Sequence, residues 1–178
     1  MQNQETLYQV TDRVATLTLN RPDKLNAWTA VMEQEVRAAM TEAEKDDNVR
    51  VIVLTGAGRG FCSGADISLL STVAQTGISE LQRAQATQTA SAGPNGARPD
   101  FQKKYSYFPA VTKPVIAAIS GPAVGLGLVI ALYADIRLAS DAARFGTAFA
   151  RRGLIAEYGM AWMLPRLVGH ANALDLLF

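Results

Sequence analysis

An uncharged stretch, Pro114–Ala134, limits the possible folds of this chain more than any other feature, because it contains no Asp, Glu, Lys or Arg. It is about as long as a membrane-spanning helix, which needs about 20 apolar residues. Prolines and glycines nevertheless divide it, at Pro114, Gly121, Pro122, Gly125 and Gly127. We therefore expect a buried strand, a glycine loop and a buried helix here, and no membrane contact.

The composition narrows the functional classes. The chain has 178 residues, is 49% hydrophobic and carries a net charge of +1. This apolar content excludes global disorder, and the balanced charge argues against a nucleic-acid partner, since such proteins usually present a basic face. We expect one domain over residues 1–178. Because the single cysteine, Cys62, cannot form an internal disulfide, we also expect a cytoplasmic location. One cysteine and one histidine exclude a zinc site of Cys and His ligands, and we expect no metal.

Hydrophobic periodicity predicts an α/β fold. Alternating residues at Thr6–Val10 and Val14–Asn20 predict a hairpin, and apolar residues at helical spacing predict a helix over Thr29–Lys45. Further buried strands are expected at Val49–Thr55, Val115–Ile119 and Asp135–Ala139, with helices at Phe101–Phe108, after Gly127 up to Tyr133, and at Gly159–Leu167. The weakly periodic stretch Thr72–Pro99 is expected to form a long loop and a pocket wall. The order strand–strand–helix–strand favours ββα repeats.

Two glycine-rich loops, 56–64 and 121–127, each follow a predicted buried strand and lead into a helix. Neither fits a dinucleotide-binding fingerprint, because Phe61 and Ile130 stand where the third glycine is required. Backbone N–H groups at a strand–helix junction are unpaired and point outward, and two that converge from different loops form an oxyanion hole. From spacing alone, two ordinary tight turns remain the alternative.

A series of short motifs follows one order along the chain. They are Asn20-Arg21-Pro22, Leu25-Asn26-Ala27, Phe61–Ile67, Lys113–Gly121, Ala134–Arg137 and Phe145-Gly146. Together they resemble the crotonase (enoyl-CoA hydratase/isomerase) superfamily. The resemblance implies a crotonase-type spiral of ββα repeats and a homotrimer or hexamer. It also implies an acyl-CoA thioester substrate, with coenzyme A as part of that substrate and no separate cofactor. Family members continue into C-terminal helices, so we expect residues 1–178 to be the core without that part.

By the same resemblance, the thioester oxygen would sit between the backbone N–H groups of Ala65 and Leu126. The substrate-binding residues would be Gly64, Ala65, Asp66, Ile67, Ser68, Gly125 and Leu126. The segment from Ala65 to Ser68 would line the coenzyme A pocket. We expect Asp66 to anchor its loop and to take no part in catalysis.

The catalytic carboxylates decide which reaction is expected. Family hydratases hold one water between two glutamates, and here Val129 and Phe149 occupy those positions. Family isomerases place one carboxylate at the position of Glu157. Leu154, Ile155, Phe149 and Met160 would surround it with apolar side chains, an environment that suits a proton-transferring base near neutral pH. A solvated glutamate near a helix N-terminus is the alternative interpretation.

We therefore expect an acyl-CoA enzyme that stabilises a thioester enolate and moves a double bond, with Glu157 as proton shuttle. Hydration of a 2-enoyl-CoA is the second hypothesis. A catalytically silent acyl-CoA-binding protein is the third, since it would explain the absence of both hydratase glutamates.

Overall fold

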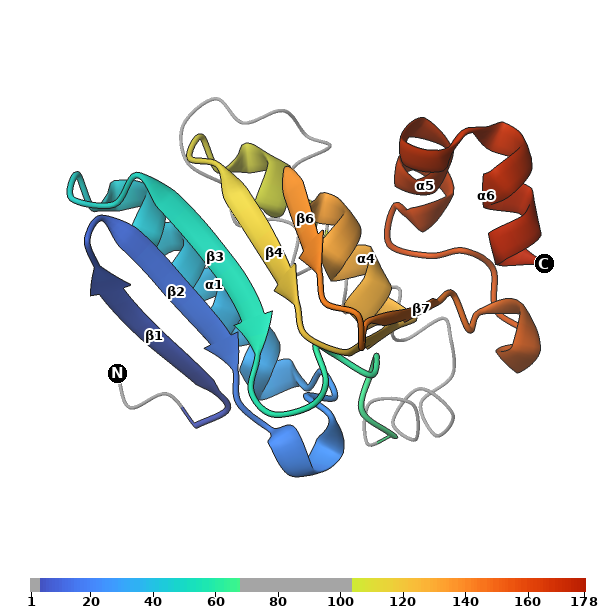
Figure 1. Ribbon diagram of the computed structural model, residues 1–178, viewed down its shortest axis with the longest axis horizontal. Coiled ribbons are helices and arrows are strands. Elements are labelled where there is room, and N and C mark those ends of the chain that lie inside the picture. The colour runs from blue at the N-terminus through green and yellow to red at the C-terminus, as the bar shows by residue number, and fades with distance from the viewer. Residues whose placement is uncertain (1–3, 68–103) are drawn as a thin grey trace.

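The computed structural model describes residues 4–67 and 104–178 (Figure 1). Its main sheet has five strands in the order β1-β2-β3-β4-β6. Their bounds are Thr6–Thr11, Val14–Leu19, Val51–Gly56, Val115–Ile119 and Ile136–Ala139. The first two strands are antiparallel and the other pairs are parallel. The predicted α/β class is therefore confirmed.

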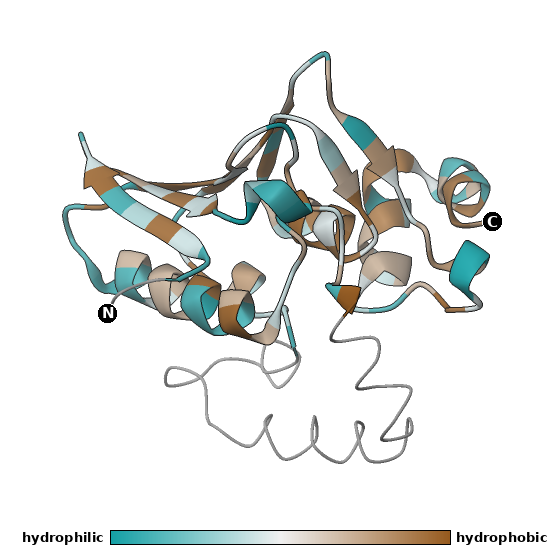
Figure 2. Ribbon diagram, turned by 90° about the horizontal axis from the view of Figure 1, so that it is seen from below, coloured by the Kyte–Doolittle hydropathy of each residue, from teal (hydrophilic) through white to brown (hydrophobic). Residues whose placement is uncertain are grey.

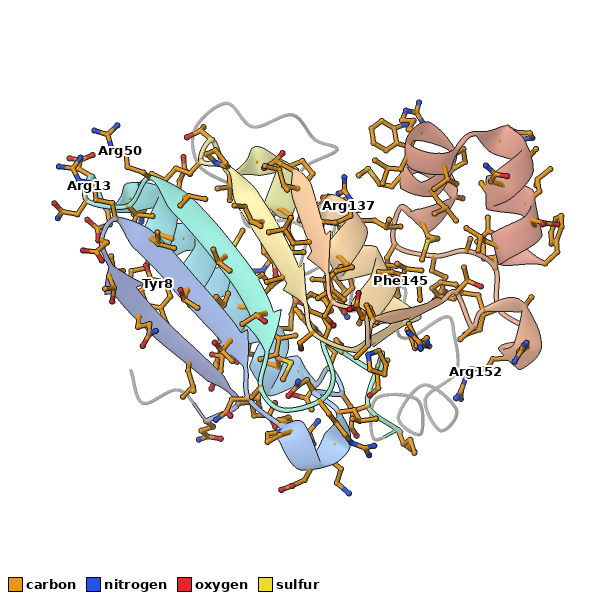
Figure 3. All side chains as sticks on the ribbon, viewed as in Figure 1. Tyr8, Arg13, Arg50, Arg137, Phe145 and Arg152 are labelled. Atoms are coloured by element: carbon orange, nitrogen blue, oxygen red, sulfur yellow. The ribbon has the colours of Figure 1, made fainter. Side chains whose placement is uncertain are left out.

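The hairpin between β1 and β2 closes through Asp12 and Arg13, whose φ angles of 50° and 67° are both left-handed. Two successive left-handed residues are the signature of the tight turn that matches the twist of paired strands. Arg13 and Arg50 lie at one end of the sheet, and the glycine loops lie at the other end, after the carboxyl ends of β3 and β4 (Figure 3).

Two helices cover the same face of the sheet, α1 (Ala30–Lys45) and α4 (Leu126–Tyr133) (Figure 2). The helix α1 begins where the Thr29 hydroxyl accepts a hydrogen bond from the Met32 N–H at 3.0 Å. Its buried side chains are Met32, Val36, Ala39, Met40 and Ala43. They face the alternate residues of the strands that point to the same side, such as Leu17 and Leu54, both fully buried.

A smaller layer continues the chain. The strands β5 (Pro122–Val124) and β7 (Arg144–Gly146) pair in parallel, and α5 (Met160–Val168) packs against both α4 and α6 (His170–Leu177). The single turns η1, η3 and η4 lie at Pro22–Lys24, Phe108–Ala110 and Ala150–Arg152. The uncharged stretch contains β4 and α4, which are the predicted strand and helix, and the predicted glycine loop between them includes the short strand β5. Across the two described ranges, no helix is long and apolar enough to cross a bilayer.

Two expectations about these elements are wrong. The strand β6 is expected to be buried, but Ile136 and Leu138 are exposed. They lie in register with Ile116 and Ala118, on the face of the sheet opposite to the buried side chains of β4, and β6 is the last strand at its edge of the described sheet. Within the predicted helix Phe101–Phe108, residues 104–107 form turns that lead into η3. The left-handed φ of 66° at Tyr105 interrupts any helix there. The expected pocket-wall loop Thr72–Pro99 lies outside the described residues.

The helix α4 packs so closely on the first glycine loop that position 127 cannot carry a side chain. A Cβ on Gly127 would lie 2.1 Å from the Cys62 carbonyl oxygen. We expect Gly127→Ala to lower the free energy of unfolding by about 3 kcal/mol, even though alanine favours a helix by about 1 kcal/mol. Urea unfolding measures this change. Gly146→Ala is the control, because its Cβ would meet Val124 at an ordinary 3.7 Å. Equal stability of the two variants would contradict the packing described.

Candidate active site

The two glycine loops lie side by side at the carboxyl edge of the sheet. The backbone N–H groups of Phe61 and Cys62 both donate to the Pro122 carbonyl, at 3.1 and 3.0 Å. The Val124 N–H donates in return to the Cys62 carbonyl at 3.0 Å, and Cys62 and Ala123 form a parallel bridge. Loops about 60 residues apart in sequence are therefore joined directly by backbone hydrogen bonds.

Glycine at position 64 permits the closest part of this approach. Its φ is +105°, and a Cβ there would lie 3.0 Å from the Val124 carbonyl oxygen and 3.8 Å from the Leu126 nitrogen. The second loop also turns at a glycine, Gly125, with φ +53°. Both conformations disfavour side chains. As a result, the peptide between residues 64 and 65 lies close to the N-terminus of α4.

The peptide before Ala65 is oriented by Trp28. The Trp28 N–H donates to the Gly64 carbonyl at 2.8 Å, and the Asp66 N–H donates to the Trp28 carbonyl at 2.9 Å. In a planar trans peptide the N–H points opposite to the carbonyl. The Ala65 N–H therefore points away from Trp28, and it makes no hydrogen bond within the part of the chain that the structure describes.

The N–H of Leu126 is oriented in the same way. The Gly125 carbonyl accepts the Val129 N–H at 3.1 Å in the first turn of α4. The Leu126 N–H therefore points outward from the helix N-terminus, where the helix dipole favours negative charge. Among residues 4–67 and 104–178 it has no acceptor. The predicted donors thus belong to adjacent loops, and each leaves its hydrogen available.

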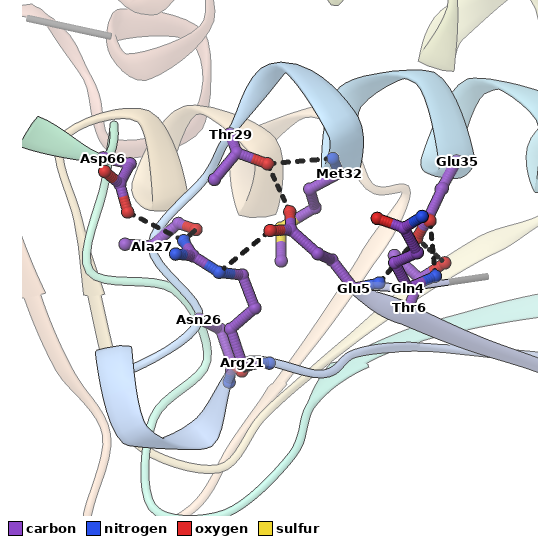
Figure 4. A network of polar contacts seen from close by, with 10 residues as sticks. All are labelled: Gln4, Glu5, Thr6, Arg21, Asn26, Ala27, Thr29, Met32, Glu35 and Asp66. Carbon is purple, nitrogen blue, oxygen red and sulfur yellow. Dashed lines mark hydrogen bonds and ion pairs between the residues drawn. The ribbon is translucent and has the colours of Figure 1, made fainter. Parts of the chain in front are cut away.

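Asp66 is bound in an ionic network (Figure 4). The Arg21 guanidinium donates from Nη1 to Asp66 Oδ2 at 2.8 Å and to the Ala27 carbonyl at 2.6 Å, and its Nε lies 3.2 Å from Glu5 Oε1. The contact between Arg21 and Asp66 is of the kind that an anchoring role for Asp66 requires. Of the other expected coenzyme A-lining residues, Ile67 is exposed, and Ser68 lies outside the described residues.

A buried asparagine holds the start of the first loop. The Asn26 side chain donates to the carbonyls of Ala57 and Gly60, at 3.0 and 2.8 Å, and accepts the Arg21 N–H at 2.8 Å. Sequence reasoning used Arg21 and Asn26 only as family motifs and assigned them no role. Their common task is to fix the glycine loop against the chain segment before α1.

Glu157 lies in the turn between η4 and α5, and it is half-buried. The Tyr133 hydroxyl donates to the Tyr158 carbonyl at 2.9 Å, and the rings of Tyr105 and Tyr158 meet edge to face at 5.0 Å. Because Tyr133 ends α4, this turn is attached to the helix whose first residue is Leu126. Among residues 4–67 and 104–178, the Glu157 carboxylate makes no hydrogen bond to either candidate donor.

The surroundings of Glu157 differ from the expectation. Phe149 and Met160 are buried, but Leu154 is exposed and Ile155 is 81% exposed. The reason is the left-handed Gly153, φ +67°, which ends η4 and directs the following residues outward. The two positions where hydratases carry glutamates are both apolar and buried, with Val129 1% and Phe149 7% exposed.

Cys62 is unsuited to nucleophilic chemistry. Burial raises the pKa of its thiol to about 12, against a smaller opposing effect of a hydrogen bond with the Gly64 backbone. The thiol therefore stays protonated near neutral pH and packs as a small apolar group.

Sequence reasoning missed one buried carboxylate, Glu33 of α1, whose side chain is 13% exposed. Its Oε2 accepts the Trp28 indole N–H at 3.1 Å, and its Oε1 lies 3.3 Å from Arg37. Burial raises the pKa of Glu33 from 4.5 to about 7, against the lowering effects of Arg37 and Lys104. In the sequence, the position of Glu33 next to Met32, at the border of the apolar face of the helix, could have indicated that it is buried.

Both the sequence and the fold of this chain are similar to those of known proteins of one family. The model of the Enoyl-CoA hydratase/isomerase family matches residues 9–178. The 1,2-epoxyphenylacetyl-CoA isomerase of Escherichia coli (strain K12) is 36% identical over 178 residues, covering 96% of this chain and 60% of that protein. The probable enoyl-CoA hydratase EchA14 of Mycobacterium tuberculosis (strain ATCC 25618 / H37Rv) is 40% identical over 166 residues, covering 92% and 57%.

A solved structure of enoyl-CoA hydratase subunit I from Geobacillus kaustophilus HTA426 superimposes with a TM-score of 0.84 at 32% identity, covering 99% of this chain and 62% of that one. The chain therefore belongs to the enoyl-CoA hydratase/isomerase, or crotonase, family. It spans about three fifths of the length of these relatives, whose names include both an isomerase and hydratases.

The raised pKa of Glu33 predicts a pH dependence of stability. Between pH 4.5 and 7 the folded chain binds a proton that the unfolded chain releases, so this group makes stability fall as pH rises. Above pH 7 this group has lowered the free energy of unfolding by its full amount, about 3 kcal/mol. We expect Glu33→Gln to be more stable than wild type at pH 8 and to lose that advantage towards pH 4.5.

Urea unfolding at several pH values between 4.5 and 8 measures this difference. Glu42→Gln is the matched control, because Glu42 is an exposed carboxylate on the same helix. If the Glu33→Gln and wild-type profiles run parallel across the range, the assignment is wrong.

Proposed function

We propose that this chain catalyses double-bond migration in an enoyl-CoA thioester, with Glu157 as the proton shuttle. The N–H groups of Ala65 and Leu126 would bind the thioester oxygen and stabilise the negative charge that develops there when a C–H proton is removed. Glu157 would take that proton from one carbon and return it to another. A single carboxylate suffices, because it is the base in the first step and the acid in the second.

The observation that carries the proposal is the apolar character of both hydratase positions. Val129 and Phe149 are buried and can neither accept nor donate a proton. A water held between two carboxylates at these positions is therefore ruled out. Glu157 occupies the position at which family isomerases carry their single carboxylate. The 36% identical relative from Escherichia coli also carries an isomerase name.

Hydration of a 2-enoyl-CoA is the second candidate, and the names of several relatives favour it. Glu157 would then position the attacking water by itself. A silent acyl-CoA-binding protein is the third candidate, which the two apolar positions also favour. Separate assays with a 3-enoyl-CoA and a 2-enoyl-CoA distinguish the three, since the silent protein binds both and converts neither.

We expect Glu157→Gln to abolish isomerisation and to leave acyl-CoA binding nearly intact. The amide has the shape of the carboxyl group, but it cannot take up and return a proton. General acid–base catalysis contributes about 10²–10⁴-fold, and a sole shuttle should lie at the upper end. Turnover of a 3-enoyl-CoA and the dissociation constant of a saturated acyl-CoA are the two measurements.

Glu42→Gln, on the exposed side of α1, serves as the control for loss of one carboxylate. Wild-type isomerisation by the Glu157→Gln variant would remove Glu157 from the mechanism. A wild-type protein that hydrates a 2-enoyl-CoA and does not isomerise would reverse the order of the first two candidates.

We further propose a homotrimer, or a hexamer of two trimers. In support, large apolar side chains are exposed on the later elements of the chain. They include Ile136, Leu138, Phe145, Trp162, Leu167 and Leu176. Exposed apolar area of this kind favours burial against another surface. We expect light scattering at micromolar concentration to give the mass of three or six chains, and a monomer alone would contradict the proposal.

A further inference from the structure

Trp28 stands between a buried carboxylate and the peptide that bears one candidate oxyanion donor. Its side chain is fully buried, and its indole N–H donates to Glu33 Oε2 at 3.1 Å. Its backbone makes the two hydrogen bonds that flank Ala65, from the Trp28 N–H to the Gly64 carbonyl and from the Asp66 N–H to the Trp28 carbonyl. A displacement of Trp28 therefore displaces the Ala65 peptide.

Within the part of the chain that the structure describes, the indole has one other directional contact. The Tyr105 ring packs against it edge to face at 5.9 Å, which restricts the plane of the ring. Glu33 supplies the hydrogen-bond acceptor for the indole N–H. Glu33 is itself held by Arg37 one helical turn later at 3.3 Å, and α1 fixes the backbone of both residues.

We propose that Glu33 is a positioning residue of the candidate active site, which holds Trp28 and thereby aims the Ala65 N–H at the thioester oxygen. The inference rests on the proposed function, because it assumes that Ala65 is a donor to the substrate. Glu33 acts through Trp28, and no step of the reaction uses its proton.

An oxyanion donor stabilises the transition state more than the bound substrate, so a misdirected N–H lowers kcat more than it weakens binding. Loss of a complete donor costs about 10²–10³-fold in rate. A donor that remains present but is misaligned should lower the rate by about tenfold. An acceptor of the same shape in place of the carboxylate should preserve the alignment, since the amide oxygen of glutamine can still accept the indole N–H.

The test compares Glu33→Leu, Glu33→Gln and Trp28→Phe in the purified protein. We expect Glu33→Leu to lower kcat for a 3-enoyl-CoA by about tenfold, while the dissociation constant of hexanoyl-CoA changes less than about threefold. Glu33→Gln should restore kcat to near the wild-type value. Trp28→Phe removes the donor of the same hydrogen bond, so it should reproduce the leucine result, and the double variant should be no worse than either single one.

A second readout is independent of turnover. The carbonyl stretching frequency of bound hexanoyl-CoA reports hydrogen bonding to the thioester oxygen. It should move towards its value in free solution in Glu33→Leu and Trp28→Phe and stay at the wild-type value in Glu33→Gln. Glu44→Leu is the matched control, because Glu44 is a carboxylate of α1 that binds Thr112 at the other end of the helix.

The outcomes separate the inference from the proposed function. A wild-type kcat and carbonyl frequency in Glu33→Leu would overturn the inference and leave the proposed function intact. The same holds if Glu33→Gln loses as much kcat as Glu33→Leu does. If Glu33→Leu does not fold, full activity of Trp28→Phe overturns it. If the wild-type protein does not isomerise, the proposed function fails, and the carbonyl frequency still decides whether Glu33 positions Ala65.

Discussion

The hydrogen bonds between the two glycine-rich loops, 56–64 and 121–127, are the interaction on which the candidate site depends. The parallel strands β3 and β4 bring both loops to one edge of the sheet, but parallel pairing alone leaves them independent. The shared Pro122 carbonyl and the return bond to Cys62 join them. The join is close enough that Gly127 has no room for a side chain, and a Cβ on Gly64 would lie only 3.0 Å from the Val124 carbonyl oxygen. The same hydrogen bonds therefore produce both the close packing of the two loops and the position of the candidate donors.

Each candidate donor takes its direction from the carbonyl that precedes it. Trp28 binds the Gly64 carbonyl and Val129 binds the Gly125 carbonyl, and peptide planarity converts both contacts into the direction of an N–H group. In a site made of backbone groups, the residues that hold the backbone determine its geometry. Asn26 and Arg21 do so through their side chains and Trp28 through its own backbone, and all three lie outside the set of substrate-contacting residues that sequence motifs identify.

The sequence predicted the elements where periodicity is strong, as in α1 and the hairpin, and failed where tertiary context decides. Ile136 and Leu138 suggest a buried strand, but apolar composition does not tell whether other elements cover the face to which these side chains point. Tyr105 adopts a left-handed conformation within an aromatic cluster, which local propensity does not reveal. Glu33 looks like any solvated glutamate on a helix until the Trp28 indole is placed beside it. The glycine loops were predictable because strand–glycine–helix junctions have a pattern of their own.

The helix α4 connects the two halves of the candidate site as a rigid spacer. Its first residue, Leu126, carries an outward N–H, and its last, Tyr133, holds the turn that contains Glu157. At about 1.5 Å per residue, its eight residues span about 12 Å. One inserted residue would lengthen the spacer by about 1.5 Å and also rotate its far end by about 100°. A change of length within α4 that keeps the direction of its far end must therefore come in about whole helical turns, so a graded change of this separation requires changes outside α4.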